Sequence, residues 1–195
     1  MKNKQAEIAQ MLTSRQLQQQ LYLSQAMIVL VTLLISFFLF DSFGDWVPLF
    51  KFAPKQLFWY GVLPGLSVVL IDLLLMRYLP EKYYDDGGIN KKIFQNQTIF
   101  SIFMIAFVVS VVEEMLFRGV IHTEFGYVIA STLFAVVHVR YLTKPVLLVS
   151  VFLLSFYLGL MFEWTNNLLV TIVAHFIIDF CLGLSIQSHA ERRRS

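Results

Sequence analysis

Six ionisable side chains lie inside three apolar stretches of the chain, where lipid-spanning helices are expected. They are Glu113, Glu114, Arg118, His138, His175 and Asp179. A titratable group at bilayer depth is costly unless it faces the interior of a helix bundle and finds partners there. Such groups on three separate helices predict one shared polar site. Carboxylates and imidazoles are also the groups that general acid–base catalysis uses.

In the first stretch, two adjacent carboxylates are expected to point in different directions from their helix. Glu114 and Arg118 are four residues apart, so they share a face and can neutralise each other. Glu113 lies about 100° further around the helix and is directed elsewhere. We therefore expect Glu113 to be the carboxylate that can act as a general base. The alternative is that all three residues form only an interhelical salt bridge.

The two histidines are interpreted together with that carboxylate. A single histidine in an apolar helix is more often a hydrogen-bonded core residue than a ligand. His138 and His175 lie on different helices, and His175 shares a face with Asp179, which can fix its tautomer. Counted from the same, non-cytoplasmic membrane face, the three motifs lie at depths of roughly 12–20 Å. They can therefore surround one cavity inside the membrane. His122, four residues after Arg118, is a weaker candidate.

Such a cavity suits hydrolysis. Glu113 and His138 could hold and deprotonate a water molecule, while His175 and Asp179 could stabilise an oxyanion. The alternative is a zinc site made by Glu113, His138 and His175, because two histidines and a carboxylate leave an open coordination position. The sequence has no His-Glu-x-x-His motif and no serine in a nucleophile elbow, which excludes a zincin helix and gives no support to a serine protease.

The elements that must position these residues are membrane-spanning helices. The chain has 195 residues, of which 57% are hydrophobic and 14% charged, against about 25% charged in soluble domains. The fold class predicted is an all-α, polytopic membrane helical bundle of about six spans, each near the ~20 residues that cross a bilayer. The predicted spans are Leu23–Phe40, Leu57–Leu79, Thr98–Ile121, Phe125–Thr143, Pro145–Phe162 and Asn167–Ile186.

These spans divide the chain into five parts. Residues 1–22 form a polar segment that fits an interfacial helix or an unstructured tail equally well. The other parts are the first two spans (23–79), a polar loop (80–97), a four-helix catalytic core (98–186) and a basic tail (187–195).

The distribution of basic residues predicts the orientation. Six spans would place twelve of the fifteen Lys and Arg residues on one side, so both termini are expected in the cytoplasm of a cell-membrane protein. The chain has no basic patch with interleaved aromatic residues, which argues against a nucleic-acid partner. Its single cysteine, Cys181, excludes an intrachain disulfide.

Three motifs in this order resemble those of the CPBP family, which comprises the CAAX prenyl endopeptidases and the bacteriocin-processing or Abi proteins. The resemblance covers about Ile99 to Gly183. Asp179 stands where the prenyl endopeptidases carry Asn, which bears on the prenyl substrate more than on catalysis. The motifs are Glu113-Glu-x-x-x-Arg118, Phe134-x-x-x-His138 and His175-x-x-x-Asp179.

The resemblance implies an intramembrane endopeptidase. Glu113 would activate water with His138, and His175 with Asp179 would stabilise the oxyanion. Glu114 and Arg118 would be supporting residues.

The implied partners are membrane lipids and a membrane-associated or lipidated peptide or protein. The implied cofactor is either none or one zinc ion, since family members are described both as glutamate proteases and as metal-dependent.

Two other functions compete with proteolysis. The first is an inert membrane scaffold or immunity protein on the same fold, although such a relative should have lost a motif residue and none is lost here. The second is a small transporter component, although no internal repeat is detectable.

Overall fold

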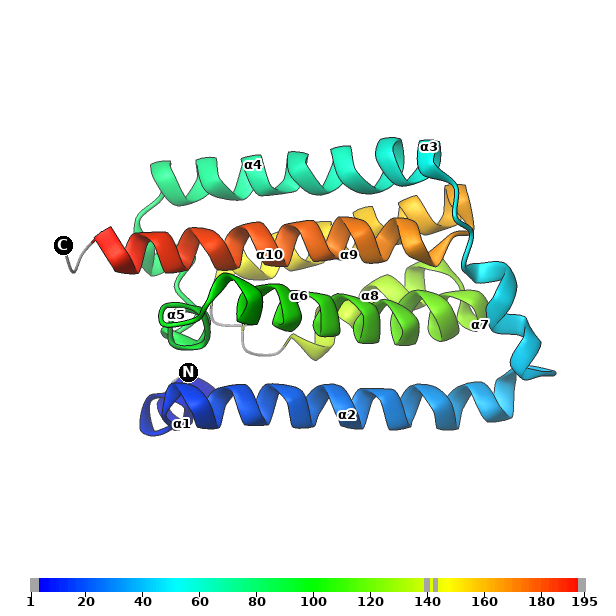
Figure 1. The fold of residues 1–195 in the computed structure, drawn as a ribbon, viewed down its shortest axis with the longest axis horizontal. Coiled ribbons are helices and arrows are strands. Elements are labelled where there is room, and N and C mark those ends of the chain that lie inside the picture. Colours follow the sequence, from blue (N-terminus) through cyan, green and yellow to red (C-terminus); the bar gives the residue numbers. More distant parts are fainter. Residues whose placement is uncertain (1–3, 139–140, 142–143, 193–195) are drawn as a thin grey trace.

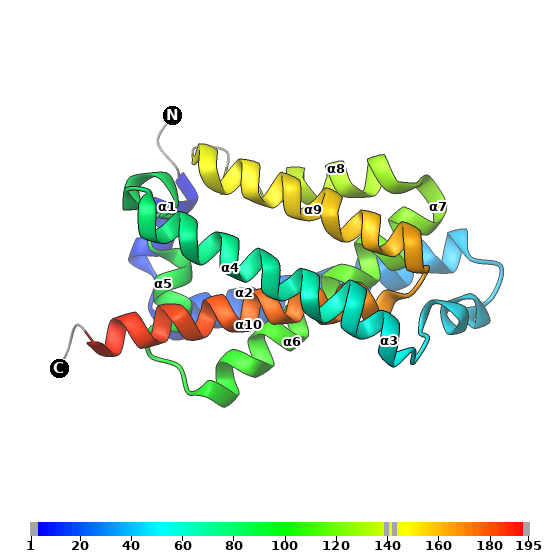
Figure 2. The same cartoon turned by 90° about the horizontal axis from the view of Figure 1, so that it is seen from above.

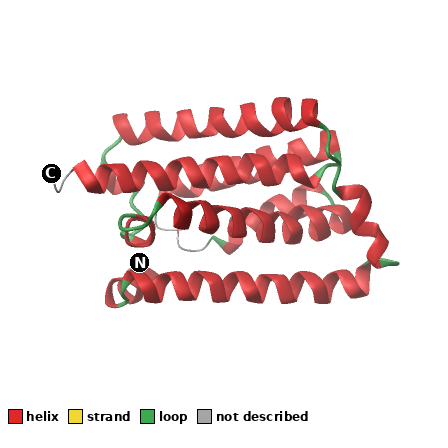
Figure 3. Cartoon of the chain, in the orientation of Figure 1, coloured by secondary structure: helices red, strands yellow, loops and turns green. Residues whose placement is uncertain are grey.

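The protein is a bundle of helices that run roughly along one common direction (Figure 1). The structure, a computed structural model, describes residues 4–138, 141 and 144–192, and no strand occurs among them (Figure 3). The elements in chain order are α1 (Lys4–Met11), α2 (Ser14–Leu39), η1 (Phe43–Leu49), α3 (Pro54–Gln56), η2 (Leu57–Val62), α4 (Leu63–Tyr78), η3 (Glu81–Tyr83), α5 (Ile89–Phe94), α6 (Ile99–Glu114), η4 (Met115–His122), α7 (Thr123–Phe125), α8 (Tyr127–Val137), α9 (Pro145–Thr165) and α10 (Leu168–Arg192).

Five helical stretches are long and apolar enough to cross a membrane, and they confirm the predicted polytopic helical bundle. They are Ser14–Leu39, Pro54–Tyr78, Ile99–Phe125, Pro145–Thr165 and Leu168–Arg192. Many of their large apolar side chains are exposed, as lipid contact requires. The protein is therefore an integral membrane protein.

The fourth predicted span, Phe125–Thr143, differs from the structure. Helix α8 covers only Tyr127–Val137, 11 residues, or about 16 Å of helix against a hydrocarbon core of about 30 Å. Gly126 before it has φ +84, and the helix ends at His138, part-way along the bundle (Figure 1). The rest of the predicted span includes residues 139–140 and 142–143, which lie outside the described residues.

The amino-terminal segment is helical. Helix α2 begins at Ser14 rather than at the predicted Leu23, because Thr13 and Gln16 form a capping box at its start. The shorter helix α1 lies across the same end of the bundle as α5 (Figures 1 and 2). Lys92 of α5 donates to the carbonyl oxygens of Ala9, Gln10 and Leu12, which lie at the end of α1.

Helix α10 occupies the centre of the bundle and packs against α4, α6 and α9. Glycines allow the close approach of η2 and α4. A Cβ atom at Gly61 of η2 would lie 3.0 Å from the Val170 oxygen, and one at Gly65 of α4 would lie 3.0 Å from the Ala174 oxygen. At the start of α10, the buried Asn167 side chain bonds both the backbone N–H and the carbonyl of Lys51. These contacts fix the axial position of α10, and hence of His175.

Both described ends of the chain lie at the same end of the bundle, as six passes require (Figure 1). Short helix α8 covers part of the predicted fourth pass. The remainder of the predicted basic tail, residues 193–195, lies outside the described part of the chain.

Candidate active site

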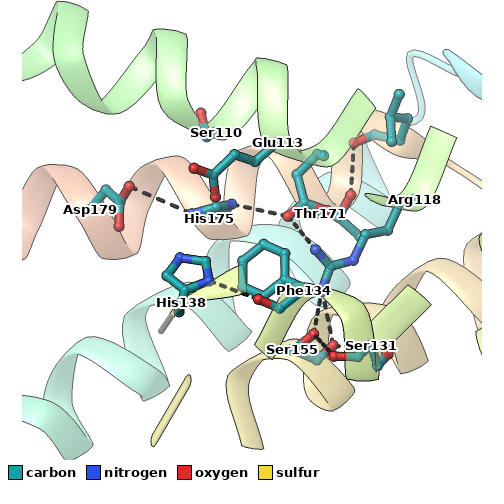
Figure 4. A network of polar contacts seen from close by, with 12 residues as sticks. Ser110, Glu113, Arg118, Ser131, Phe134, His138, Ser155, Thr171, His175 and Asp179 are labelled. Atoms are coloured by element: carbon teal, nitrogen blue, oxygen red, sulfur yellow. Dashed lines mark hydrogen bonds and ion pairs between the residues drawn. The ribbon is translucent and has the colours of Figure 1, made fainter. Parts of the chain in front are cut away.

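A continuous set of polar contacts joins three of the long helices near the middle of the bundle (Figure 4). Nη1 of Arg118 donates to Oε1 of Glu114 over 2.9 Å, and both side chains are fully buried. The same carboxylate oxygen lies 3.0 Å from Nδ1 of His175. Nε2 of His175 in turn lies 3.5 Å from Oδ2 of Asp179. The chain of contacts therefore runs from Arg118 through Glu114 and His175 to Asp179.

Arg118 comes from a locally widened turn of the helix. Residues Met115–His122 are π-helical and continue directly from α6, a feature often found at functional sites. Nη2 of Arg118 reaches across to α9, where it donates to the backbone oxygen of Ser155 over 2.9 Å. The guanidinium also lies over the ring of Phe134, 4.5 Å from its centroid. One buried cation thus joins three helices.

Two serines that the sequence analysis missed connect α8 to α9. Oγ of Ser155 donates to the backbone oxygen of Ser131 over 2.8 Å, and both serines are fully buried. Gly159 makes this approach possible, because a Cβ atom there would lie 2.5 Å from Oγ of Ser131. Polar residues in an apolar span are the signal that could have identified these serines.

His138 lies at the end of α8, beyond its last helical residue. Its Nδ1 lies 2.7 Å from the backbone oxygen of Phe134. Because a carbonyl can only accept, Nδ1 carries the hydrogen, and the lone pair of the neutral imidazole is on Nε2. Phe134 therefore sits between Arg118, which lies over its ring, and His138, which bonds its carbonyl.

Glu113 is directed away from the Glu114–Arg118 pair, as its helix position predicts. It accepts a hydrogen bond of 3.2 Å from Nε2 of Gln25 on α2. Glu113, His138, His175 and Asp179 all line one large cavity of about 1510 Å³. The structure thus brings the four predicted catalytic residues to one space, while Glu114 and Arg118 lie buried behind it.

The cavity extends from this site toward the end of the bundle where both termini lie. Its far lining comes from α1, α5 and the end of α10, and its walls are mostly apolar. His122 does not line the cavity. Its Nε2 lies 2.8 Å from Oε2 of Glu163 on α9.

The predicted zinc ligands do not fit a metal ion as the side chains lie. Among the residues that the structure describes, no group of three His, Cys, Asp or Glu side chains is placed to hold one. Both ring nitrogens of His175 face carboxylates, Nδ1 toward Glu114 and Nε2 toward Asp179. A metal would have to displace one of these contacts. The zinc alternative remains a prediction for elemental analysis.

Comparison with known proteins identifies the family of this chain. A family model described as type II CAAX prenyl endopeptidase Rce1-like matches residues 95–181, which include every motif residue. The chain is also 41% identical over 171 residues to the uncharacterized protein YpbD of Bacillus subtilis (strain 168), over 88% of this chain and 90% of YpbD. No solved structure matches the chain. The chain belongs to the CPBP family, with the fold of a CAAX-type intramembrane protease.

Proposed function

We propose that this protein is an intramembrane endopeptidase in which Glu113 and His138 activate a water molecule. The observation that carries the proposal is that the two adjacent glutamates have different surroundings. Glu114 is fully buried and engaged by Arg118 and His175, whereas Glu113 lines the cavity. A general base must reach its substrate through such a cavity.

The hydrogen bond of His138 favours the tautomer that this role needs. Its Nδ1–H is held by the Phe134 carbonyl, so Nε2 is the nitrogen that can accept a proton. Glu113 and His138 come from α6 and from the end of α8, and both line the cavity. Together they can polarise a water molecule for attack on a peptide carbonyl.

His175 and Asp179 would stabilise the negative charge that develops on the substrate. With carboxylates at both ring nitrogens, the imidazolium is the form that can donate to both. Asp179 is one-third exposed and lies at the cavity side of the pair. The positive charge of this imidazolium, at the wall of the cavity, can stabilise the oxyanion that forms during hydrolysis.

The cavity fits a substrate with a large apolar group. Its volume of about 1510 Å³ exceeds the ~300–1,000 Å³ typical of small-ligand pockets, and its apolar walls suit a lipidated or membrane-embedded peptide. The distribution of basic residues supports a cytoplasmic position for both termini by the positive-inside rule. The cavity, which extends toward the same end, would then receive substrate from the cytoplasmic side.

The test uses the full-length protein in liposomes with two fluorogenic peptides. One is farnesylated at the cysteine of a C-terminal Cys-a-a-X sequence, and the other is an apolar peptide without a lipid. Wild type should cleave at least one of them. Glu113→Gln should lower kcat by roughly 10²–10⁴ and keep the protein folded. Glu124→Gln, an exposed glutamate outside the cavity lining, is the matched control.

Two outcomes would contradict the proposal. One is that wild type cleaves neither peptide, which would favour an inert scaffold. The other is that Glu113→Gln cleaves at the wild-type rate.

A further inference from the structure

We propose that Gln25 on α2 is a positioning residue for Glu113. The inference rests on the proposed function, in which Glu113 is the general base. Nε2 of Gln25 lies 3.2 Å from Oε1 of Glu113, and both residues line the cavity. Helix α2 lies outside residues 95–181, the part that matches the family model. The site therefore takes a residue from a helix that carries none of the three motifs.

The environment of Gln25 argues for a role beyond helix packing. Its side chain is buried, and its Oε1 has no hydrogen-bond partner among the described residues. Leaving one end of a buried amide unpaired is unfavourable. An apolar side chain at this position would fill space without leaving a polar atom unpaired. The donation to Glu113 explains why an amide is present.

Two other buried polar residues on the same helix provide a contrast. Thr32 and Ser36 lie seven and eleven residues after Gln25, so all three share one face of α2. The hydroxyl of Thr32 donates to the backbone of Ile28, and that of Ser36 donates to Leu33. Both bond within their own helix. Gln25 instead reaches across to α6.

The hydrogen bond fixes the orientation of the Glu113 carboxylate at the wall of the cavity. Other charged groups act on Glu113 from the surrounding helices. Arg118 and His175 interact with it electrostatically. Asp72 of α4, His138 just after α8 and Asp179 of α10 line the same cavity. In addition to these charges, Gln25 provides a hydrogen-bond donor that points at the Glu113 carboxylate.

The first experiment measures the contact without any substrate, as a double-mutant cycle of thermal stability in detergent. The cycle compares wild type, Gln25→Leu, Glu113→Leu and the double variant. The effects of the two single changes should be non-additive, because each of them removes the same hydrogen bond. A control cycle that pairs Thr32→Val with Glu113→Leu should be additive.

The second experiment measures cleavage of the farnesylated peptide or of the lipid-free peptide. Gln25→Leu should lower kcat by roughly 10- to 100-fold, the equivalent of one charge-assisted hydrogen bond, with KM nearly constant. Thr32→Val should match wild type.

The outcomes separate the inference from the proposed function. Additive effects of Gln25→Leu and Glu113→Leu on stability overturn the inference, whether or not the protein is a protease. An equal fall of kcat in Gln25→Leu and Thr32→Val also overturns it, because both would then act through packing. Non-additive effects together with full cleavage by Glu113→Gln would refute the proposed function and leave the contact between Gln25 and Glu113 established.

Discussion

Nδ1 of His175 lies 3.0 Å from Oε1 of Glu114, the same oxygen that Arg118 binds. This contact joins two pairs that each have a four-residue spacing, Glu114 with Arg118 and His175 with Asp179. Oε1 of Glu114 therefore contacts both the Arg118 guanidinium and the His175 imidazole. Replacement of Arg118 should consequently also alter the environment of His175, because both side chains contact the same carboxylate.

Loss of Arg118 should destabilise the whole bundle. Arg118→Ala leaves the buried Glu114 without its cation and removes the bond to Ser155, and breaking a buried pair from one side costs about 3–5 kcal/mol. Thermal unfolding in detergent should show a clear loss, with activity falling in parallel. Arg77→Ala, an exposed arginine on α4, should show little change. Wild-type stability with lost turnover would instead indicate that Arg118 takes part directly in the chemistry.

Two replacements of Asp179 should show whether His175 needs a hydrogen-bond acceptor at this position or a negative charge. Asp179→Asn keeps an oxygen for Nε2 of His175, so kcat should stay within about tenfold of wild type. Asp179→Leu removes that acceptor, and the loss should reach roughly 10²–10³, as for other oxyanion-site groups. Stability should change little in both variants, because the side chain is one-third exposed. Equal and full activity in both would show that Asp179 has no part in the reaction.

The His122–Glu163 pair should be dispensable for cleavage. It joins η4 to α9 outside the cavity lining, and the Glu163 side chain is 56% exposed. Glu163→Gln should therefore keep kcat/KM within about twofold of wild type, as is typical of exposed substitutions. His138→Ala, measured in parallel, should abolish cleavage. A large loss in Glu163→Gln would place a second functional group at this end of the bundle.

Metal dependence can be tested directly. Both ring nitrogens of His175 already face carboxylates, so we expect elemental analysis to find no stoichiometric metal. Strong chelators should leave cleavage intact. One zinc per chain, with activity lost on chelation and restored by zinc, would show that the site rearranges into a metalloprotease centre.

The sequence was sufficient to predict the fold class and the main pairing at the site. Apolar segments of bilayer length predict a helical membrane bundle, because lipid cannot bond an exposed backbone. The four-residue spacings of Glu114 with Arg118 and of His175 with Asp179 predict contacts that the structure contains. Helical periodicity also predicts that Glu113 points elsewhere. These are local properties, which a single helix determines.

Contacts between helices were decided only by the tertiary structure. The bond between His175 and Glu114, the donation from Gln25 to Glu113, and the Ser155–Ser131 bridge each join residues far apart in sequence. Their geometry depends on how helices rotate and approach one another, which periodicity does not specify. The early end of α8 at His138 is a similar case, since its apolar composition is compatible with a longer helix. The sequence thus determined which residues each helix presents, and packing determined which of them meet.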